Sequence, residues 1–198
     1  MLWGLDRTTL FLTSGALGLV LGTVCLGPIA RKIDKKYYAA ALSLVTGVCF
    51  LSFFFVPKGQ FGLMIAVNML AQFCAGPTSA LTWALYADVA DYGEVKYRRR
   101  STGLIYSASL FSIEPGILIG GFLVPLFLAK FGYVKGAATQ TANALLGIAL
   151  AFSIGPAFFA LLKAGALMIY PLNQKRVDEI ERELAARRAA AAAETKLA

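Results

Sequence analysis

The chain has 198 residues, of which 58% are hydrophobic and only 15% are charged, and its mean hydropathy is +0.67. Soluble domains carry about a quarter charged residues, so this composition excludes an ordinary soluble protein and indicates a membrane protein. The formal net charge is +8 and the chain has no histidine. The commonest metal ligand and the commonest general base are therefore missing, and we expect no catalytic site, metal site or cofactor.

Five apolar segments follow one another along the chain. An α-helix rises about 1.5 Å per residue, so about 20 residues cross about 30 Å of hydrocarbon. A strand of a membrane barrel needs only about 10 residues, far fewer than these continuous apolar runs contain. The sequence therefore predicts an all-α membrane protein with five transmembrane helices, at residues 8–29, 37–56, 61–87, 103–129 and 142–170.

The third segment carries polar and aromatic residues at helical spacing. Such a face turns toward protein or water rather than lipid, and Gly76-Pro77 interrupts it near mid-depth, where broken helices line substrate sites in transporters. Amides and hydroxyls beside an aromatic ring are typical of sugar binding, whereas polar contacts between packed helices are the alternative. The residues on this face are Asn68, Gln72, Gly76, Ser79, Trp83 and Tyr86.

An acidic cluster follows the third segment. Asp88, Asp91 and Glu94 lie three residues apart and share one helical face near a helix C-terminus, where the helix dipole is already negative. This placement is unfavourable unless cations compensate it, and a solvated loop is the alternative. We expect the cations to come from the basic residues just downstream, which are Lys96, Arg98, Arg99 and Arg100.

Two charged residues lie inside the last two apolar segments. Glu114 is about 16 Å from Gly103 along a helix, close to the midplane, where an acidic side chain is a functional candidate; a structural hydrogen bond is the alternative. Ser107 lies seven residues before Glu114 and shares its face. Lys163 lies about 10 Å from the segment end at Tyr170, which favours snorkelling to the interface over an ion pair with Glu114.

The residues after the fifth segment predict a short amphipathic helix. Asn173 is placed to cap it, and three apolar residues share one of its faces: Val177, Ile180 and Leu184. We expect this helix to lie on the membrane surface, with Arg187 and Arg188 near anionic lipid. The Ala-rich residues 185–193 favour a solvated or frayed tail. Residues 173–198 would thus form a tail after a transmembrane bundle at residues 1–172.

Lysine and arginine gather after the first segment, after the third segment and in the tail. The other two connections hold only Lys58 and the pair Lys130 and Lys135. This alternation follows the positive-inside rule, so we expect both basic loops and the C-terminus to be cytoplasmic. Five spans then place Met1 outside without a signal peptide. The sequence therefore predicts that a preceding helix is missing and that the chain is the C-terminal piece of a longer protein.

Several motifs carry a family resemblance: Ala87-Asp88-Val89-Ala90-Asp91-Tyr92-Gly93-Glu94-Val95-Lys96, Gly103-Leu104-Ile105-Tyr106-Ser107, Phe131-Gly132-Tyr133-Val134 and Tyr170-Pro171-Leu172. The first two look like the junction of the tenth and eleventh helices in the glycoside-pentoside-hexuronide symporters, the sodium:galactoside or melibiose carrier-like family of the major facilitator superfamily. The basic loop at residues 27–36 also resembles a loop signature of that superfamily. The resemblance runs over nearly the whole chain, from the eighth helix to the C-terminus.

The resemblance implies five helices of a major facilitator C-terminal half in a bacterial inner membrane. It implies part of a symporter that moves a sugar or glycoside by alternating access, with Na+ or H+ coupled mainly at a site outside this chain. We expect a solute pathway with Asn68, Gln72, Ser79, Trp83, Ser107 and Glu114. We expect cytoplasmic gating by Asp88, Asp91, Glu94, Arg98, Arg99 and Arg100.

Other interpretations compete with a transporter that is active by itself. A truncated product or a split-transporter subunit would need separate N-terminal helices and would not transport alone. An enzyme is poorly supported because no nucleophile, base and orienting group converge. Nucleic-acid binding is disfavoured because the basic residues are divided among membrane-bounded loops. The expected partners are therefore a sugar-like solute, the lipid bilayer and the missing N-terminal helices.

Overall fold

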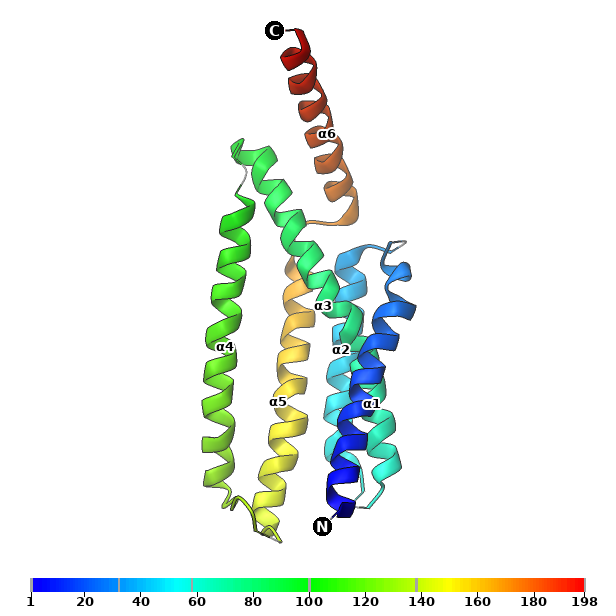
Figure 1. The fold of residues 1–198 in the computed structure, drawn as a ribbon, viewed down its shortest axis with the longest axis vertical. Helices are drawn as coiled ribbons and strands as arrows, with labels where there is room; N and C mark the ends of the chain where they lie inside the picture. The colour runs from blue at the N-terminus through cyan, green and yellow to red at the C-terminus, as the bar shows by residue number, and fades with distance from the viewer. Residues whose placement is uncertain (1, 32, 58, 100, 138, 198) are drawn as a thin grey trace.

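The computed structural model describes residues 2–31, 33–57, 59–99, 101–137 and 139–197. Within these ranges the chain is helical and contains no strand, which confirms the all-α prediction. Five helices stand side by side along the long axis of the molecule, and a sixth extends beyond them (Figure 1). The α-helices are α1 (Leu2–Leu26), α2 (Lys35–Ser52), α3 (Phe61–Tyr97), α4 (Thr102–Lys130), α5 (Ala142–Ile169) and α6 (Gln174–Leu197), with short 3-10 turns at Pro28–Arg31 and Phe53–Phe55.

Helices α1 to α5 are each long and apolar enough to cross a membrane, as predicted. The third span differs from its predicted end at residue 87, because α3 continues as a helix to Tyr97. Its 37 residues correspond to about 55 Å, nearly twice the thickness of the hydrocarbon core. The acidic motif therefore lies on a helical extension of the bundle, and α3 ends at Tyr97, where the C-cap residue Arg98 has a left-handed φ of 52°.

Polar side chains set the starts of three helices. The Asp34 carboxylate accepts from the backbone N of Lys36 (3.0 Å) at the start of α2. The hydroxyl of Thr141 accepts from the backbone N of Ala144 (3.2 Å) at the start of α5. The Asn173 side chain accepts from the backbone N of Arg176 (3.0 Å), which confirms it as the cap of α6.

Helices α1 and α3 pack at backbone distance along part of their length. A Cβ atom added to Gly18 would lie 2.5 Å from the carbonyl oxygen of Met69, and one added to Gly22 would collide with the carbonyl of Phe73. These glycines let two helices approach in a membrane, where close packing replaces the hydrophobic effect as the main attraction. The α1–α3 contact fixes the lower half of α3 (Figure 1).

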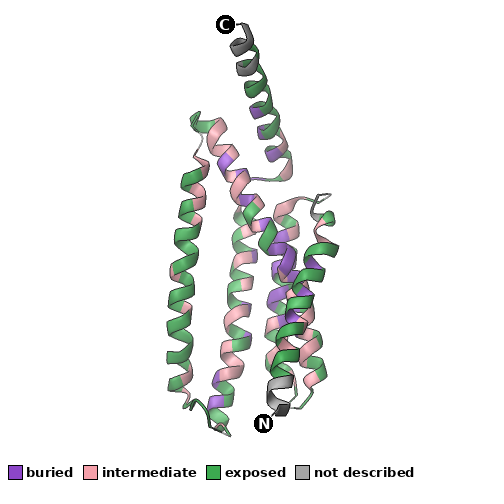
Figure 2. Cartoon of the chain, in the orientation of Figure 1, coloured by how far each residue is buried: buried purple, intermediate pink, exposed green. Residues whose placement is uncertain are grey.

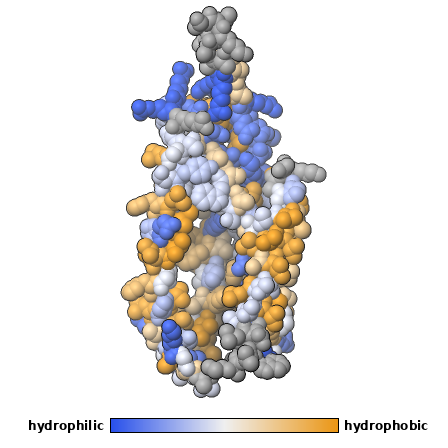
Figure 3. All heavy atoms as spheres, in the orientation of Figure 1, coloured by the Kyte–Doolittle hydropathy of each residue, from blue (hydrophilic) through white to orange (hydrophobic). Residues whose placement is uncertain are grey.

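Burial is concentrated where α2, α3 and α5 meet, and it is nearly absent from α4 (Figure 2). The described residues of α4 include none that is buried. Large apolar side chains are exposed on each of α1 to α5, and on the face shown in Figure 3 hydrophilic ones gather at the end that carries α6. This surface suits a lipid environment around the spans and a polar phase around α6.

The three basic regions lie at one end of the molecule. The α1–α2 connection, the α3–α4 connection and α6 are together at the top of Figure 1, and the N-terminus and the other two connections are at the bottom. The fold therefore brings together the loops that the charge pattern assigns to a single side of the membrane.

Helix α6 differs from its predicted form. The Ala-rich residues 185–193 continue the helix rather than forming a frayed tail, and the helix projects beyond the bundle (Figure 1). Its apolar face does not lie free for a membrane surface, because it packs on the end of α3. Leu172, Val177, Ile180 and Leu184 form a buried cluster there, against Val89, Tyr92, Val95 and Tyr170.

Candidate functional site

A cavity of about 690 Å³ lies between α2, α3, α4 and α5. It is open to one side, and Figure 3 shows a hollow between apolar flanks with hydrophilic atoms inside it. This volume is within the range of small-molecule sites, about 300 to 1,000 Å³. The polar and aromatic lining residues are Ser43, Thr46, Thr78, Ser79, Thr82, Trp83, Tyr86, Lys163 and Tyr170.

The polar face predicted on α3 divides between two environments. Ser79, Trp83 and Tyr86 line the cavity. Asn68 instead is buried against α1, where its Nδ2 donates to the carbonyl oxygen of Phe11 (3.0 Å). Gln72 also faces α1, since a Cβ on Gly15 would lie 3.4 Å from its Cγ.

This division means that Asn68 and Gln72 contact α1 rather than line the cavity, and their place on a solute pathway stays a prediction. The physical reason is the tilt of α3. The helix leans across the bundle, so one helical face meets α1 in its lower half and the cavity in its upper half (Figure 1).

Three aromatic rings form a group at the α3 side of the cavity. The ring of Trp83 stacks on that of Tyr106 in α4, with centroids 5.9 Å apart and planes inclined by 8°. The rings of Trp83 and Tyr86 form a T-shaped pair, with centroids 5.7 Å apart and planes inclined by 90°. The expected pathway included Ser107, which is exposed and does not line the cavity. Tyr106, the residue before Ser107, contacts Trp83 instead, because adjacent helical residues point about 100° apart. Tyr106 belongs to the family motif but was not predicted as a site residue.

The two intramembrane charges also occupy different surroundings. Glu114 is exposed on α4, and its neighbour Ile113 lines the cavity. Lys163 is half-buried on α5 and lines the cavity. Within the described part of the chain no ion pair joins Glu114 to Lys163. The role of Glu114 in transport stays a prediction.

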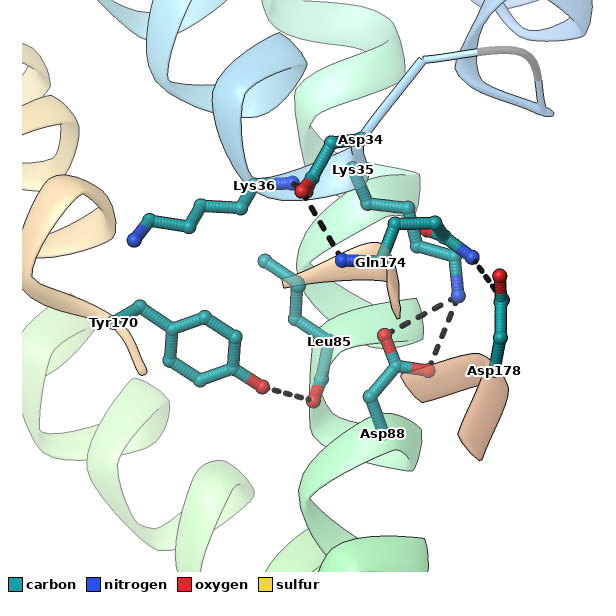
Figure 4. Close-up of polar contacts among 8 residues, drawn as sticks. All are labelled: Asp34, Lys35, Lys36, Leu85, Asp88, Tyr170, Gln174 and Asp178. Atoms are coloured by element: carbon teal, nitrogen blue, oxygen red, sulfur yellow. Dashed lines mark hydrogen bonds and ion pairs between the residues drawn. The ribbon is translucent and has the colours of Figure 1, made fainter. Parts of the chain in front are cut away.

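A partly buried ion pair joins α2 to the extension of α3. The Nζ of Lys35 lies 3.1 Å from Oδ1 and 3.2 Å from Oδ2 of Asp88, whose side chain is 7% exposed (Figure 4). The expectation that Asp88 pairs with the basic residues downstream of it is therefore wrong. Because α3 stays helical through Tyr97, those residues are carried beyond Asp88, and the start of α2 supplies the cation instead.

The same region connects α2 to α6. Asp34 accepts from the backbone N of Gln174 (3.1 Å) with its second carboxylate oxygen, and Gln174 in turn donates to Asp178 (2.9 Å). The hydroxyl of Tyr170 donates to the carbonyl oxygen of Leu85 in α3 (3.4 Å). Figure 4 shows these contacts beside the Lys35–Asp88 pair, so one polar cluster holds α2, α3 and α6 together.

The rest of the predicted gating cluster lies farther along α3. Arg188 of α6 pairs with Glu94 (3.4 Å), and Arg98 borders the same surface recess. Asp91 is half-buried, Arg99 is exposed, and Arg100 lies outside the described residues. The Lys96 ammonium lies over the rings of Tyr92 and Tyr97, at 5.6 and 5.3 Å from their centroids.

Apolar spans, a cavity of small-molecule size between them and an ion-paired cluster at one end are the features of a polytopic helical membrane protein. The chain belongs to the family described as MFS/sugar transport protein, which matches residues 4–174. This agrees with the resemblance carried by the motifs.

Curated relatives cover almost all of this chain. It is 33% identical over 192 residues to the "Putative glycoside/cation symporter YagG" of Escherichia coli K12, covering 93% of this chain and 40% of the relative. It is 31% identical to the "Uncharacterized symporter YnaJ" of Bacillus subtilis 168 (92% and 40%). It is 30% identical to the "Glucuronide carrier protein homolog" of Escherichia coli K12 (91% and 40%). The chain thus spans about two fifths of the length of these relatives.

Proposed function

We propose that this chain supplies helices to a cation-coupled secondary transporter that moves a sugar-like solute by alternating access. The observation that carries the proposal is the cavity among α2, α3, α4 and α5, where hydroxyl groups and an aromatic group face one space. Hydroxyls exchange hydrogen bonds with a sugar, and the ring of Trp83 offers an apolar face on which a sugar can stack. Family membership and the names of the relatives support the same function.

The polar cluster at the end of the bundle that carries α6 is suited to act as a gate for the cavity. The Lys35–Asp88 pair and the contacts of Asp34 with α6 lie at the end where the basic loops gather, which we assign to the cytoplasm of a bacterial cell. A solute leaving toward that side requires these contacts to rearrange, as alternating access demands. We propose that the cluster stabilises a state closed toward the cytoplasm.

In the proposed transporter, movement of the solute is coupled to movement of a cation. A ligand shifts a conformational equilibrium only through its different affinities for the two states, so solute and cation must favour the same state. We propose Na+ or H+ as the cation, bound mainly by acidic residues of helices outside this chain. Glu114 is the candidate contribution of this chain, as an acidic residue at mid-membrane depth on an exposed face.

An uptake panel tests this function. The complete carrier, meaning this chain together with the helices that complete the transporter, is expressed in cells that do not accumulate the test glycosides. We expect at least one labelled glycoside to accumulate above its external concentration, and a removed Na+ gradient or a proton uncoupler to abolish the accumulation. Glycoside entry that only equilibrates would contradict coupling, and no entry at all would contradict transport.

A second candidate is a membrane subunit that does not transport on its own. The observation that favours it is the uncovered surface of α4, which has no buried residue among those described. Expressing this chain with and without the additional helices tests the second candidate, which concerns the chain alone and is compatible with transport by the complete carrier. Uptake by the chain alone would contradict the second candidate, and uptake only in their combined presence would support it.

A further inference from the structure

Among the described residues that line the cavity, Lys163 is the only one with a charged side chain. It lies on α5, about 9 Å from the helix end at Ile169, and it is half-buried. In the ranges that the structure describes, no carboxylate pairs with its ammonium group. A cation in a low-dielectric interior is unfavourable without a counter-charge, so the cavity has a positive charge that its own lining does not neutralise.

The position of Lys163 distinguishes it from a lysine that only reaches the membrane surface. It lines the cavity together with Thr46 of α2 and Thr82 of α3, so its side chain borders the space between these helices. Glu114, the other charge at membrane depth, does not line the cavity. The space around Lys163 is therefore a place where a solute, rather than a neighbouring side chain, can meet the ammonium group.

A second group in the same cavity also lacks a partner. The hydroxyl oxygen of Ser43 is buried, and it has no hydrogen-bond partner among the described residues. The neighbouring threonine hydroxyls differ, because each donates to a carbonyl of its own helix: Thr46 to Leu42, Thr78 to Cys74 and Thr82 to Thr78. Ser43 thus keeps an unused donor in the same cavity as Lys163, a cation that has three donors and no acceptor.

We propose that the cavity binds an acidic sugar, with its anionic group held by the Lys163 ammonium and the Ser43 hydroxyl. A charge-assisted hydrogen bond is stronger than a neutral one, and both protein groups offer hydrogen atoms to anionic oxygens. Trp83 and Tyr86 supply the apolar surface for the sugar ring. This inference rests on the proposed transport function and specifies the class of solute for the same cavity.

Matched pairs of solutes test the inference in the complete carrier. Methyl β-D-glucuronide and methyl β-D-glucoside differ only by a carboxylate in place of a hydroxymethyl group, and the corresponding galacturonide and galactoside form a second pair. We expect faster uptake of an acidic member than of its neutral partner. We expect Lys163→Gln to lower that uptake about 10-fold or more without lowering neutral uptake, and Lys163→Arg to retain most of it.

Lys130→Gln is the matched control, because it removes an exposed lysine at the last residue of α4. Immunoblots of membranes normalise each rate to the amount of carrier present. Neutral glycosides taken up in preference to acidic ones, with Lys163→Gln unchanged, would overturn the acidic-sugar inference and leave the transport function standing. If Lys163→Gln lowered uptake of the acidic and the neutral solute equally, and Lys163→Arg did not restore it, Lys163 would have a packing role instead. No uptake of either pair by the wild-type carrier would overturn the transport function and the inference with it.

Discussion

Asn68 and Trp83 belong to the same polar face of α3 in the sequence, yet they do different things in the structure. Asn68 is 3% exposed and bonds to the backbone of α1, whereas Trp83 is 38% exposed and lines the cavity. The side chain of Asn68 therefore contributes to the stability of the bundle, and that of Trp83 remains available to a solute.

Replacing Asn68 with Leu should destabilise the bundle without changing solute preference. The substitution removes the Nδ2 hydrogen bond to Phe11 while keeping the side-chain volume similar, and such bonds between membrane helices are worth about 0.6 to 1.7 kcal/mol. Thermal unfolding in detergent measures the loss. Thr13→Val is the control, because the Thr13 hydroxyl is exposed and donates to Thr9 of its own helix. Equal unfolding temperatures for Asn68→Leu and wild type would contradict the packing role.

The sequence was sufficient for the spans because twenty-residue apolar runs leave few alternatives to helices in a bilayer. It was not sufficient for the site residues. Helical periodicity places Asn68 and Ser79 on one face, but which neighbour that face meets depends on the tilt of α3, and the tilt follows from glycine contacts such as that of Gly22 with Phe73. Likewise, the partner of Asp88 is 53 residues away in sequence, a distance that local patterns do not encode.

At the scale of elements, α6 is an integral part of the polar end of the molecule rather than a separate tail. Its apolar face covers the extension of α3, its first backbone N–H groups meet Asn173 and Asp34, and Arg188 pairs with Glu94. The amphipathic pattern and the cap could be read from the sequence. The surface that they meet could not, because the sequence does not show that α3 continues as a helix to Tyr97 or which of its faces turns toward α6.

Replacing only Lys35 of the Lys35–Asp88 pair should destabilise the protein more than replacing both residues. Lys35→Met leaves a buried carboxylate without its cation and should destabilise the protein by up to about 3 kcal/mol, reduced from buried-pair values because the Lys35 side chain is 25% exposed. The double variant Lys35→Met with Asp88→Leu should recover most of that loss. Unfolding in detergent with increasing denaturant measures both variants.

Arg187→Met provides the comparison for this cycle. Arg187 pairs with Glu183 within α6, and both side chains are well exposed, so the variant should change stability by no more than about 0.5 kcal/mol. If the double variant were as unstable as Lys35→Met, the destabilisation would come from lost packing rather than from an uncompensated Asp88.

At the scale of the whole molecule, apolar surface and charge are separated along one axis. Exposed apolar side chains occur on all of α1 to α5, and the three basic regions share the end from which α6 extends (Figure 1). Lysine and arginine are retained on the cytoplasmic side during insertion, so the axis has a direction relative to the membrane. Since the helices alternate in direction, the α3–α4 and α4–α5 connections must lie on opposite sides.

Cysteine labelling measures that direction. Arg99 lies in the α3–α4 connection and Lys135 in the α4–α5 connection, and both are exposed. Cys25, which is exposed, is first replaced by Ser, while buried Cys49 and Cys74 are kept. In intact spheroplasts a membrane-impermeant maleimide should label Lys135→Cys strongly and Arg99→Cys only after the membrane is permeabilised. The reverse pattern would place α6 outside the cell and would remove the cytoplasmic gate, because the Lys35–Asp88 pair would then close the external side. Labelling of both positions in intact spheroplasts would contradict a single orientation. It would then also contradict the argument that the basic loops keep that end of the carrier in the cytoplasm.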